Sequence, residues 1–109
     1  MTPEERKRFG AVFTRRKDAT KLAASLPKSK LKTGTIMDAC CGEGELIVAV
    51  VKRMLKLGLE PKDIARRIHG VDIVPAHIAT TIKRLETLLG SQPILRKNFV
   101  VKDIFSSDS

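Results

Sequence analysis

The sequence predicts an α/β fold in which about three parallel strands alternate with helices. Three short apolar segments, residues 35–40, 68–74 and 99–105, have the length and composition of buried strands. Longer segments with apolar residues at helical spacing lie between them. Strands that alternate with such helices are typical of a parallel sheet with right-handed crossover connections.

The first elements of the chain are predicted to be helical and basic. A proline and two acidic residues indicate a short helix start at residues 3–9. Residues 15–26 are expected to form a helix, with Thr14 as its cap and Pro27 directly after it. Residues 28–33 are expected to be a basic connector.

Two long helices and one short helix are predicted between the strands. The segment 45–57 has its polar residues on one helical face, and Gly58 follows as the stop. A short helical turn is expected at 61–67. A second long helix is expected at 75–89, because it begins with proline, keeps apolar residues at helical spacing and is followed by Gly90.

Charge divides the chain into two parts. The net charge is +9 over 109 residues. Residues 1–33 hold ten Lys or Arg and three acidic residues, whereas residues 34–109 hold eleven and nine. We therefore expect a basic helical arm at 1–33 and an α/β domain at 34–109. The arm favours contact with phosphates, and a merely solvated charged segment is the alternative.

Composition argues against several other classes of protein. No apolar run approaches the ~20 residues of a membrane span, and no secretory signal is visible, so a cytoplasmic protein is expected. The adjacent Cys40 and Cys41 do not have a metal-binding spacing and rarely form a disulfide with each other. They are interpreted as buried, reduced thiols. No metal site is expected.

The candidate site lies where the predicted strands end. Ligands of parallel α/β sheets bind beyond the carboxyl ends of the strands. An aspartate stands at each of these ends: Asp38, Asp72 and Asp103. This convergence is the main sign of a binding site.

The turn after the first strand contains Gly42 and Gly44, which allow the backbone to turn tightly and approach a ligand. The third glycine of a dinucleotide fingerprint is missing, since Ile47 stands at its position. Glu43 and Glu45 would repel a pyrophosphate at the following helix start. No phosphate-binding Gly-x-x-x-x-Gly-Lys pattern is present. S-adenosylmethionine, which has a sulfonium and an ammonium but no phosphate, suits these acidic neighbours.

The other two aspartates have both a functional and a structural interpretation. Asp72 can accept hydrogen bonds from ribose hydroxyls, or cap the helix that begins at Pro75. Asp103, with Ile104 beside it, can contact adenine, or lie as a solvated strand end near the terminus.

Two stretches, 34–46 and 70–75, resemble the donor-binding half of adenine-specific DNA methyltransferases of restriction–modification systems and their phage relatives. The first motif of this family reads roughly Asp-Pro-Ala-Cys-Gly-Thr-Gly, followed by an apolar helix. Its matches here are Asp38, Cys41, Gly42 and Gly44, whereas positions 39, 40 and 43 depart from it.

The second of these stretches and two further segments extend the resemblance to about residues 10–105. The stretch from Gly70 to Pro75 matches the second motif of the family. Residues 10–14 resemble an upstream segment that packs over the methionine end of the donor, although Arg15 replaces its proline. Residues 102–105 resemble the third motif loosely. The resemblance implies donor contacts by Phe13, Thr14, Asp38, Cys41, Gly42, Gly44, Asp72, Ile73, Asp103 and Ile104.

The resemblance also implies a three-layer, Rossmann-like half-domain with strands in the order 3-2-1. These enzymes act through an Asn/Asp-Pro-Pro-aromatic motif on the fourth strand. No two prolines are adjacent in this chain, so no catalytic residue is predicted. A further segment or a partner chain is expected to supply the chemistry. The first strand is expected to have an apolar open edge that favours self-association or a partner.

Three functions remain open from the sequence. The first is a partial or split DNA adenine methyltransferase that uses S-adenosylmethionine and contacts DNA through its basic arm, in a bacterial or phage-infected cell. The second is a non-enzymatic module that binds nucleic acid or protein. The third is part of an RNA or small-molecule methyltransferase. Residues 13–14 and 70–75 favour the first over the third.

Overall fold

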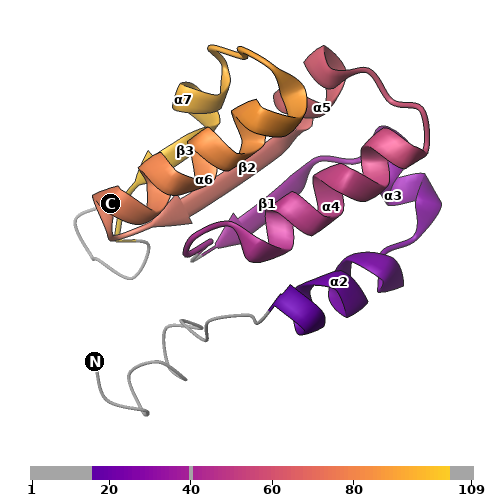
Figure 1. Cartoon of the computed structure of the whole chain (residues 1–109), viewed down its shortest axis with the longest axis horizontal. Helices are drawn as coiled ribbons and strands as arrows, with labels where there is room; N and C mark the ends of the chain where they lie inside the picture. Colours follow the sequence, from indigo (N-terminus) through magenta and orange to yellow (C-terminus); the bar gives the residue numbers. More distant parts are fainter. Residues whose placement is uncertain (1–15, 40, 104–109) are drawn as a thin grey trace.

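The computed structural model describes residues 16–39 and 41–103 (Figure 1). In chain order, its elements are α2 (Arg16–Ser25), α3 (Lys28–Thr33), β1 (Ile36–Ala39), α4 (Glu45–Lys56), α5 (Pro61–Arg67), β2 (Ile68–Asp72), α6 (Pro75–Leu89), α7 (Leu95–Asn98) and β3 (Phe99–Val101). The predicted helix start at residues 3–9 lies outside this part of the chain. The alternation of strands and helices confirms the α/β class.

The three strands form one parallel sheet. β2 is central and pairs with both β1 and β3, so the predicted strand order is confirmed. In the register, Asp38 lies beside Gly70, and Gly70 lies beside Phe99. Because side chains alternate along a strand, Asp38, Gly70 and Asp72 face the same side of the sheet. The register therefore brings both aspartates to one face at the carboxyl edge.

Helices lie on one face of the sheet in the described part of the chain, with α4 and α6 in front of the strands (Figure 1). This face carries Ile68 and Phe99, which are buried in the core. On the other face, Met37 is 58% exposed and Val100 is 37% exposed, whereas Val71 on the central strand is buried. The predicted third layer is therefore not observed among these residues. Two right-handed crossovers that advance in the same direction, from β1 to β2 to β3, place both helices on the same face.

Other predictions of local structure need correction. Residues 28–33 form the helix α3 instead of a connector, and the short helix α7 lies between the predicted helix 75–89 and the third strand, where no element was predicted. The strands are also shorter than predicted, since β2 ends at Asp72 and β3 at Val101. The helices at 61–67 and 75–89 have the predicted bounds.

The central strand has a close contact at Gly70. A Cβ atom built on Gly70 would lie 2.6 Å from two ring carbons of Phe99 and 3.3 Å from Cβ of Cys41. Phe99 is 2% exposed, so its ring has little room to move. Because Gly70 has no side chain, this ring can lie across β2, close to Cys41 at the start of the glycine turn.

A buried arginine joins α3 and the start of β1 to α5. The side chain of Arg67, which is 10% exposed, donates from Nε to the carbonyl oxygen of Gly34 at 2.9 Å and from Nη2 to the carbonyl oxygens of Lys30 and Leu31. It also pairs with Asp63 at 3.2 Å. Helices leave their last carbonyl groups without partners. Arg67 supplies a donor to the carbonyl oxygen of Leu31 and a second donor to that of Lys30, which also accepts from the N–H of Gly34 at 2.8 Å.

The N-terminal helices pack against α4. Ala23 of α2 and Leu31 of α3 belong to the hydrophobic core, and Arg53 of α4 donates to the carbonyl oxygens of Ala23 and Leu26 at the end of α2. The described part of the basic segment is therefore attached to the α/β sheet through α4. None of the helices among the described residues has the length and apolar character needed to cross a membrane.

Candidate functional site

The turn between β1 and α4 lies at the carboxyl edge of the sheet, between the two strand-end aspartates. It begins at Cys41, whose N–H donates to the carbonyl oxygen of Val71 at 2.9 Å, beyond the last paired residue of β1. It ends at Gly44, whose carbonyl oxygen accepts the first hydrogen bond of α4 from Val48 at 2.8 Å. The turn is therefore joined to β2 at one end and to α4 at the other.

Both glycines of the turn have left-handed backbone conformations. The φ angles are 55° at Gly42 and 89° at Gly44. At Gly44 space is also limited, because an added Cβ would lie 2.9 Å from the side-chain Cγ2 of Thr81. Side chains rarely adopt this conformation, so glycine is required at Gly44 for two independent reasons. The sequence prediction of a tight glycine turn is confirmed.

The carboxylate of Asp72 connects the turn to the start of α6. Its Oδ2 accepts a hydrogen bond from the N–H of Gly42 at 2.9 Å. Its Oδ1 accepts one from the N–H of Val74 at 2.8 Å and lies 3.2 Å from Nδ1 of His77. The side chain is 10% exposed. Asp72 therefore holds two loops together, and α6 itself begins without a side-chain cap.

Asp38 is the second carboxylate of the site. Burial, together with the charge of Asp72, raises the pKa of Asp38 from its ordinary 3.8 to about 6. Among the described residues, no Lys or Arg forms an ion pair with either aspartate. The site thus concentrates negative charge, and its basic contact is the imidazole ring of His77 at Asp72.

The raised pKa of Asp38 predicts a pH dependence of folding stability. Between pH 3.8 and about 6 the folded chain binds more protons at Asp38 than the unfolded chain, so this contribution is full below pH 3.8 and is lost as the pH rises through 6. The expected loss is about 2–3 kcal/mol. Urea unfolding of the wild type and Asp38→Asn between about pH 4 and 8 measures it, because the variant has no titrating group there.

As the pH rises, the free energy of unfolding of wild type should fall relative to that of Asp38→Asn. Glu60→Gln is the matched control, since Glu60 is exposed at the opposite edge, ahead of α5. For Glu60→Gln the difference from wild type should not change with pH. If the difference for Asp38→Asn is equally independent of pH, the raised pKa of Asp38 is contradicted.

Two residues of α6 contribute to the turn without having been predicted. The hydroxyl of Thr81 donates to the carbonyl oxygen of Gly42 at 3.0 Å and lies 4.0 Å from Sγ of Cys41. His77, one helical turn before Thr81 on α6, contacts Asp72. Both lie on the side of α6 that faces the turn. The available signal was a polar residue, Thr81, within the apolar stripe of a buried helix.

The thiol of Cys41 has a structural environment. The side chain is 6% exposed, and burial raises the pKa of this thiol to about 12. A thiol with so high a pKa is not a nucleophile near neutral pH. The prediction of a buried thiol is confirmed for Cys41, and Cys40 lies outside the described residues. Within residues 16–39 and 41–103, no group of three or more His, Cys, Asp or Glu is arranged to hold a metal ion.

The acidic start of α4 is partly neutralised. Nη1 of Arg84 donates to Oε1 of Glu45 at 2.7 Å and to the carbonyl oxygen of Glu43 at 2.9 Å. The expected repulsion of phosphate by two glutamates is therefore weaker at Glu45, which has a basic partner, than at the exposed side chain of Glu43.

The remaining predicted site residues lie around this edge or outside the described chain. Ile73 follows Asp72 and is 52% exposed. Asp103 is exposed and follows β3, whose continuation stays close to β2 through a 3.0 Å hydrogen bond from the N–H of Lys102 to the carbonyl oxygen of Asp72. Phe13, Thr14 and Ile104 lie outside the described residues.

Comparison of the chain with family models, with curated proteins and with solved structures finds no match. The interpretation of the site therefore depends on its own geometry and charge.

Proposed function

We propose that this edge of the sheet binds S-adenosylmethionine. The chain would then be the Rossmann-like, donor-binding portion of an adenine-specific DNA methyltransferase. The main support is the pair of strand-end carboxylates, Asp38 and Asp72, which lie beside the glycine turn without a Lys or Arg ion pair among the described residues. Such a site favours a ligand with positive charge and no phosphate, as expected for a sulfonium and an ammonium group.

The hydrogen-bonding capacity of Asp72 fits a ribose ligand. A carboxylate offers about four acceptor positions, and the N–H groups of Gly42 and Val74 and the ring of His77 use three of them. One position on Oδ2 remains for a ribose hydroxyl. A second hydroxyl would compete with His77 for Oδ1. When bound, the donor supplies an electrophilic methyl group on sulfur.

Methyl transfer would need groups beyond those of the proposed site. The sequence has no adjacent prolines, and thus no Asn/Asp-Pro-Pro-aromatic motif that would hold an extruded adenine. We therefore propose that a further segment or a partner chain completes the enzyme. The donor-binding function itself is testable on this chain alone.

Calorimetric titration with S-adenosylmethionine tests this proposal. We expect wild type to bind, and Asp72→Ala to bind about ten- to a hundredfold more weakly, because a hydrogen bond to a charged group is worth about 1.5–3 kcal/mol. Asp72→Asn keeps an acceptor oxygen but removes the charge, so its affinity should fall between the two. Glu60→Gln, an exposed control, should bind like wild type.

The product S-adenosylhomocysteine provides a second comparison, since it lacks the sulfonium charge. If the carboxylates select for charge, it should bind wild type more weakly than the donor does. Equal affinities of wild type and folded Asp72→Ala for the donor, or no binding by either, would reject the site. Thermal unfolding of each variant shows whether it is folded.

A further inference from the structure

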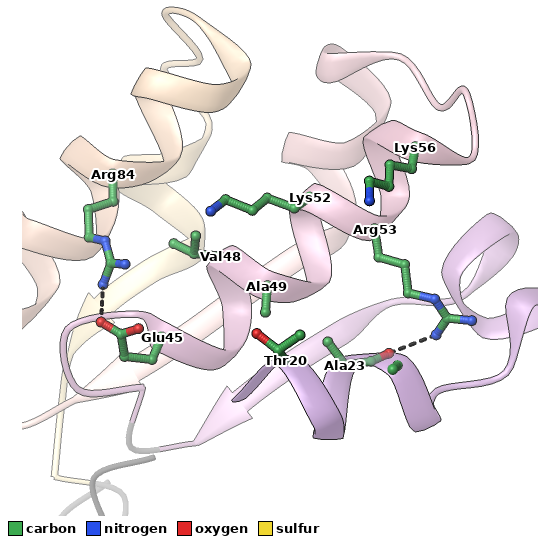
Figure 2. Close-up of a pocket in the computed structure, with 10 residues that line it drawn as sticks. Thr20, Ala23, Glu45, Val48, Ala49, Lys52, Arg53, Lys56 and Arg84 are labelled. Atoms are coloured by element: carbon green, nitrogen blue, oxygen red, sulfur yellow. Dashed lines mark hydrogen bonds and ion pairs between the residues drawn. The ribbon is translucent and has the colours of Figure 1, made fainter. Parts of the chain in front are cut away.

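A groove of about 340 Å³ lies between α2 and α4, on the side of the helix layer shown in Figure 2. Small side chains form its walls: Ala23 and Ala24 on α2, and Val48 and Ala49 on α4. The groove reaches from the start of α4 to its last residue, Lys56. It is separate from the carboxylate pair, since neither Asp38 nor Asp72 lines it.

Four basic side chains line this groove, and two of them, Arg53 and Arg84, have hydrogen-bond partners in the fold. Arg53 bonds the carbonyl oxygens at the end of α2, and Arg84 pairs with Glu45. Lys52 and Lys56 are exposed and form no ion pair among the described residues. They lie four residues apart on α4, where side chains are neighbours on one helix face. Figure 2 shows both lysines extending from α4 beside the groove.

The positive charge continues beyond the groove along α2 and α3. Residues 16–33 contain six Lys or Arg and one acidic residue. Four of these lysines are exposed: Lys21, Lys28, Lys30 and Lys32. Both helices contact α4, so these lysines lie on helices that pack against the one carrying Lys52 and Lys56. This excess of positive charge in the elements around the groove complements a polymer with regularly spaced negative charges.

We propose that this groove, with Lys52 and Lys56, binds the sugar–phosphate backbone of a nucleic acid. The two lysines would contact neighbouring phosphates, and the small walls would leave room for the sugars between them. Among the described residues, no aromatic side chain lines the groove, so we expect contacts with the backbone and no stacking of bases on these residues. This proposal does not depend on donor binding at the glycine turn.

The test compares two double variants that remove equal charge. Lys52→Gln/Lys56→Gln changes the groove, whereas Lys62→Gln/Lys97→Gln changes exposed lysines on α5 and α7 that do not line it. Binding of each full-length protein to a short fluorescein-labelled DNA duplex is measured by fluorescence anisotropy, without donor. The measurement is repeated between about 50 and 200 mM salt, because the slope of log affinity against log salt counts phosphate contacts.

The groove variant should bind at least tenfold more weakly at about 0.1 M salt, with its slope reduced by about two. The control variant should keep a slope near that of wild type. Equal losses in both variants would show that only total charge matters and would overturn the proposal. It would also be overturned if wild type binds no DNA. The same holds if, in a parallel titration with a labelled acidic peptide, the groove variant loses affinity for the peptide but keeps its affinity for DNA. Donor titration of the same groove variant should be unchanged, which separates this result from the proposed function.

Discussion

Gly70→Ala is expected to lower the free energy of unfolding by about 2–3 kcal/mol, or more if the sheet cannot adjust. The new methyl carbon would lie 2.6 Å from the ring of Phe99, well inside van der Waals contact. Phe99 is buried and its strand pairs directly with Gly70, so relief requires movement of the ring or of β3. Urea unfolding of wild type and variant measures the loss.

A double-mutant cycle shows whether this contact is the cause. Phe99→Leu alone should destabilise the chain by leaving a cavity, but it should also make Gly70→Ala much less costly, giving a clear interaction energy. Gly58→Ala is a useful control, because Gly58 has a positive φ of 84° and nothing within 4 Å of an added Cβ. It reports the cost of a left-handed backbone, which Gly70 does not have, in the absence of a steric clash. Strictly additive losses for Gly70→Ala and Phe99→Leu would contradict the packing explanation.

Arg67→Ala is expected to cost about 3–5 kcal/mol, because it removes the arginine donor from the carbonyl oxygens of Leu31 and Gly34 and opens space beneath α3. The lost hydrogen bonds are those to the carbonyl oxygens of Lys30, Leu31 and Gly34. Those carbonyls lie immediately before β1, so the start of the sheet should be affected as well. Urea unfolding measures the global loss, and amide hydrogen exchange in α3 measures the local one.

Arg66→Ala is the matched control for this variant. Arg66 is the neighbouring residue, pairs with the same Asp63, and is 66% exposed at its side chain. Its replacement should have little effect on stability, because exposed ion pairs contribute little. Arg67→Lys should recover only part of the loss, since an ammonium cannot reproduce the planar fork of the guanidinium. Similar losses for Arg66→Ala and Arg67→Ala would contradict the role given to the buried arginine.

The elements with strong local signals were predictable from the sequence. The helix at 75–89 has proline at its start, a regular apolar stripe and glycine after its end, and the structure has the same bounds. The helix α3 lacked such a pattern, since five of its six residues are charged or small polar ones around a single buried Leu31. Two carbonyl oxygens near its end, those of Lys30 and Leu31, accept hydrogen bonds from Arg67, more than thirty residues later in the chain. A contact of that range is not visible in a local window.

In the candidate site, too, features with a local cause were predictable and features that depend on long-range contacts were not. The glycine turn was predictable, because Gly42 and Gly44 adopt conformations that glycine favours for local reasons. The contact of Thr81 with that turn joins residues 39 positions apart in the sequence. The close approach of Gly70 to Phe99 likewise depends on the register of β2 against β3. Parallel pairing and helix packing, which the sequence does not specify locally, determine both.

The one-sided helix layer has a geometric consequence for any unit added to this sheet. Among the described residues, β1 pairs only with β2, so its outer edge has open backbone groups. A strand that followed β3 and joined this edge in parallel would reverse the direction of travel across the sheet. Its right-handed connection would then place a helix over the opposite face, where Met37 and Val100 are exposed. One added strand and helix would therefore satisfy the edge and cover the bare face together.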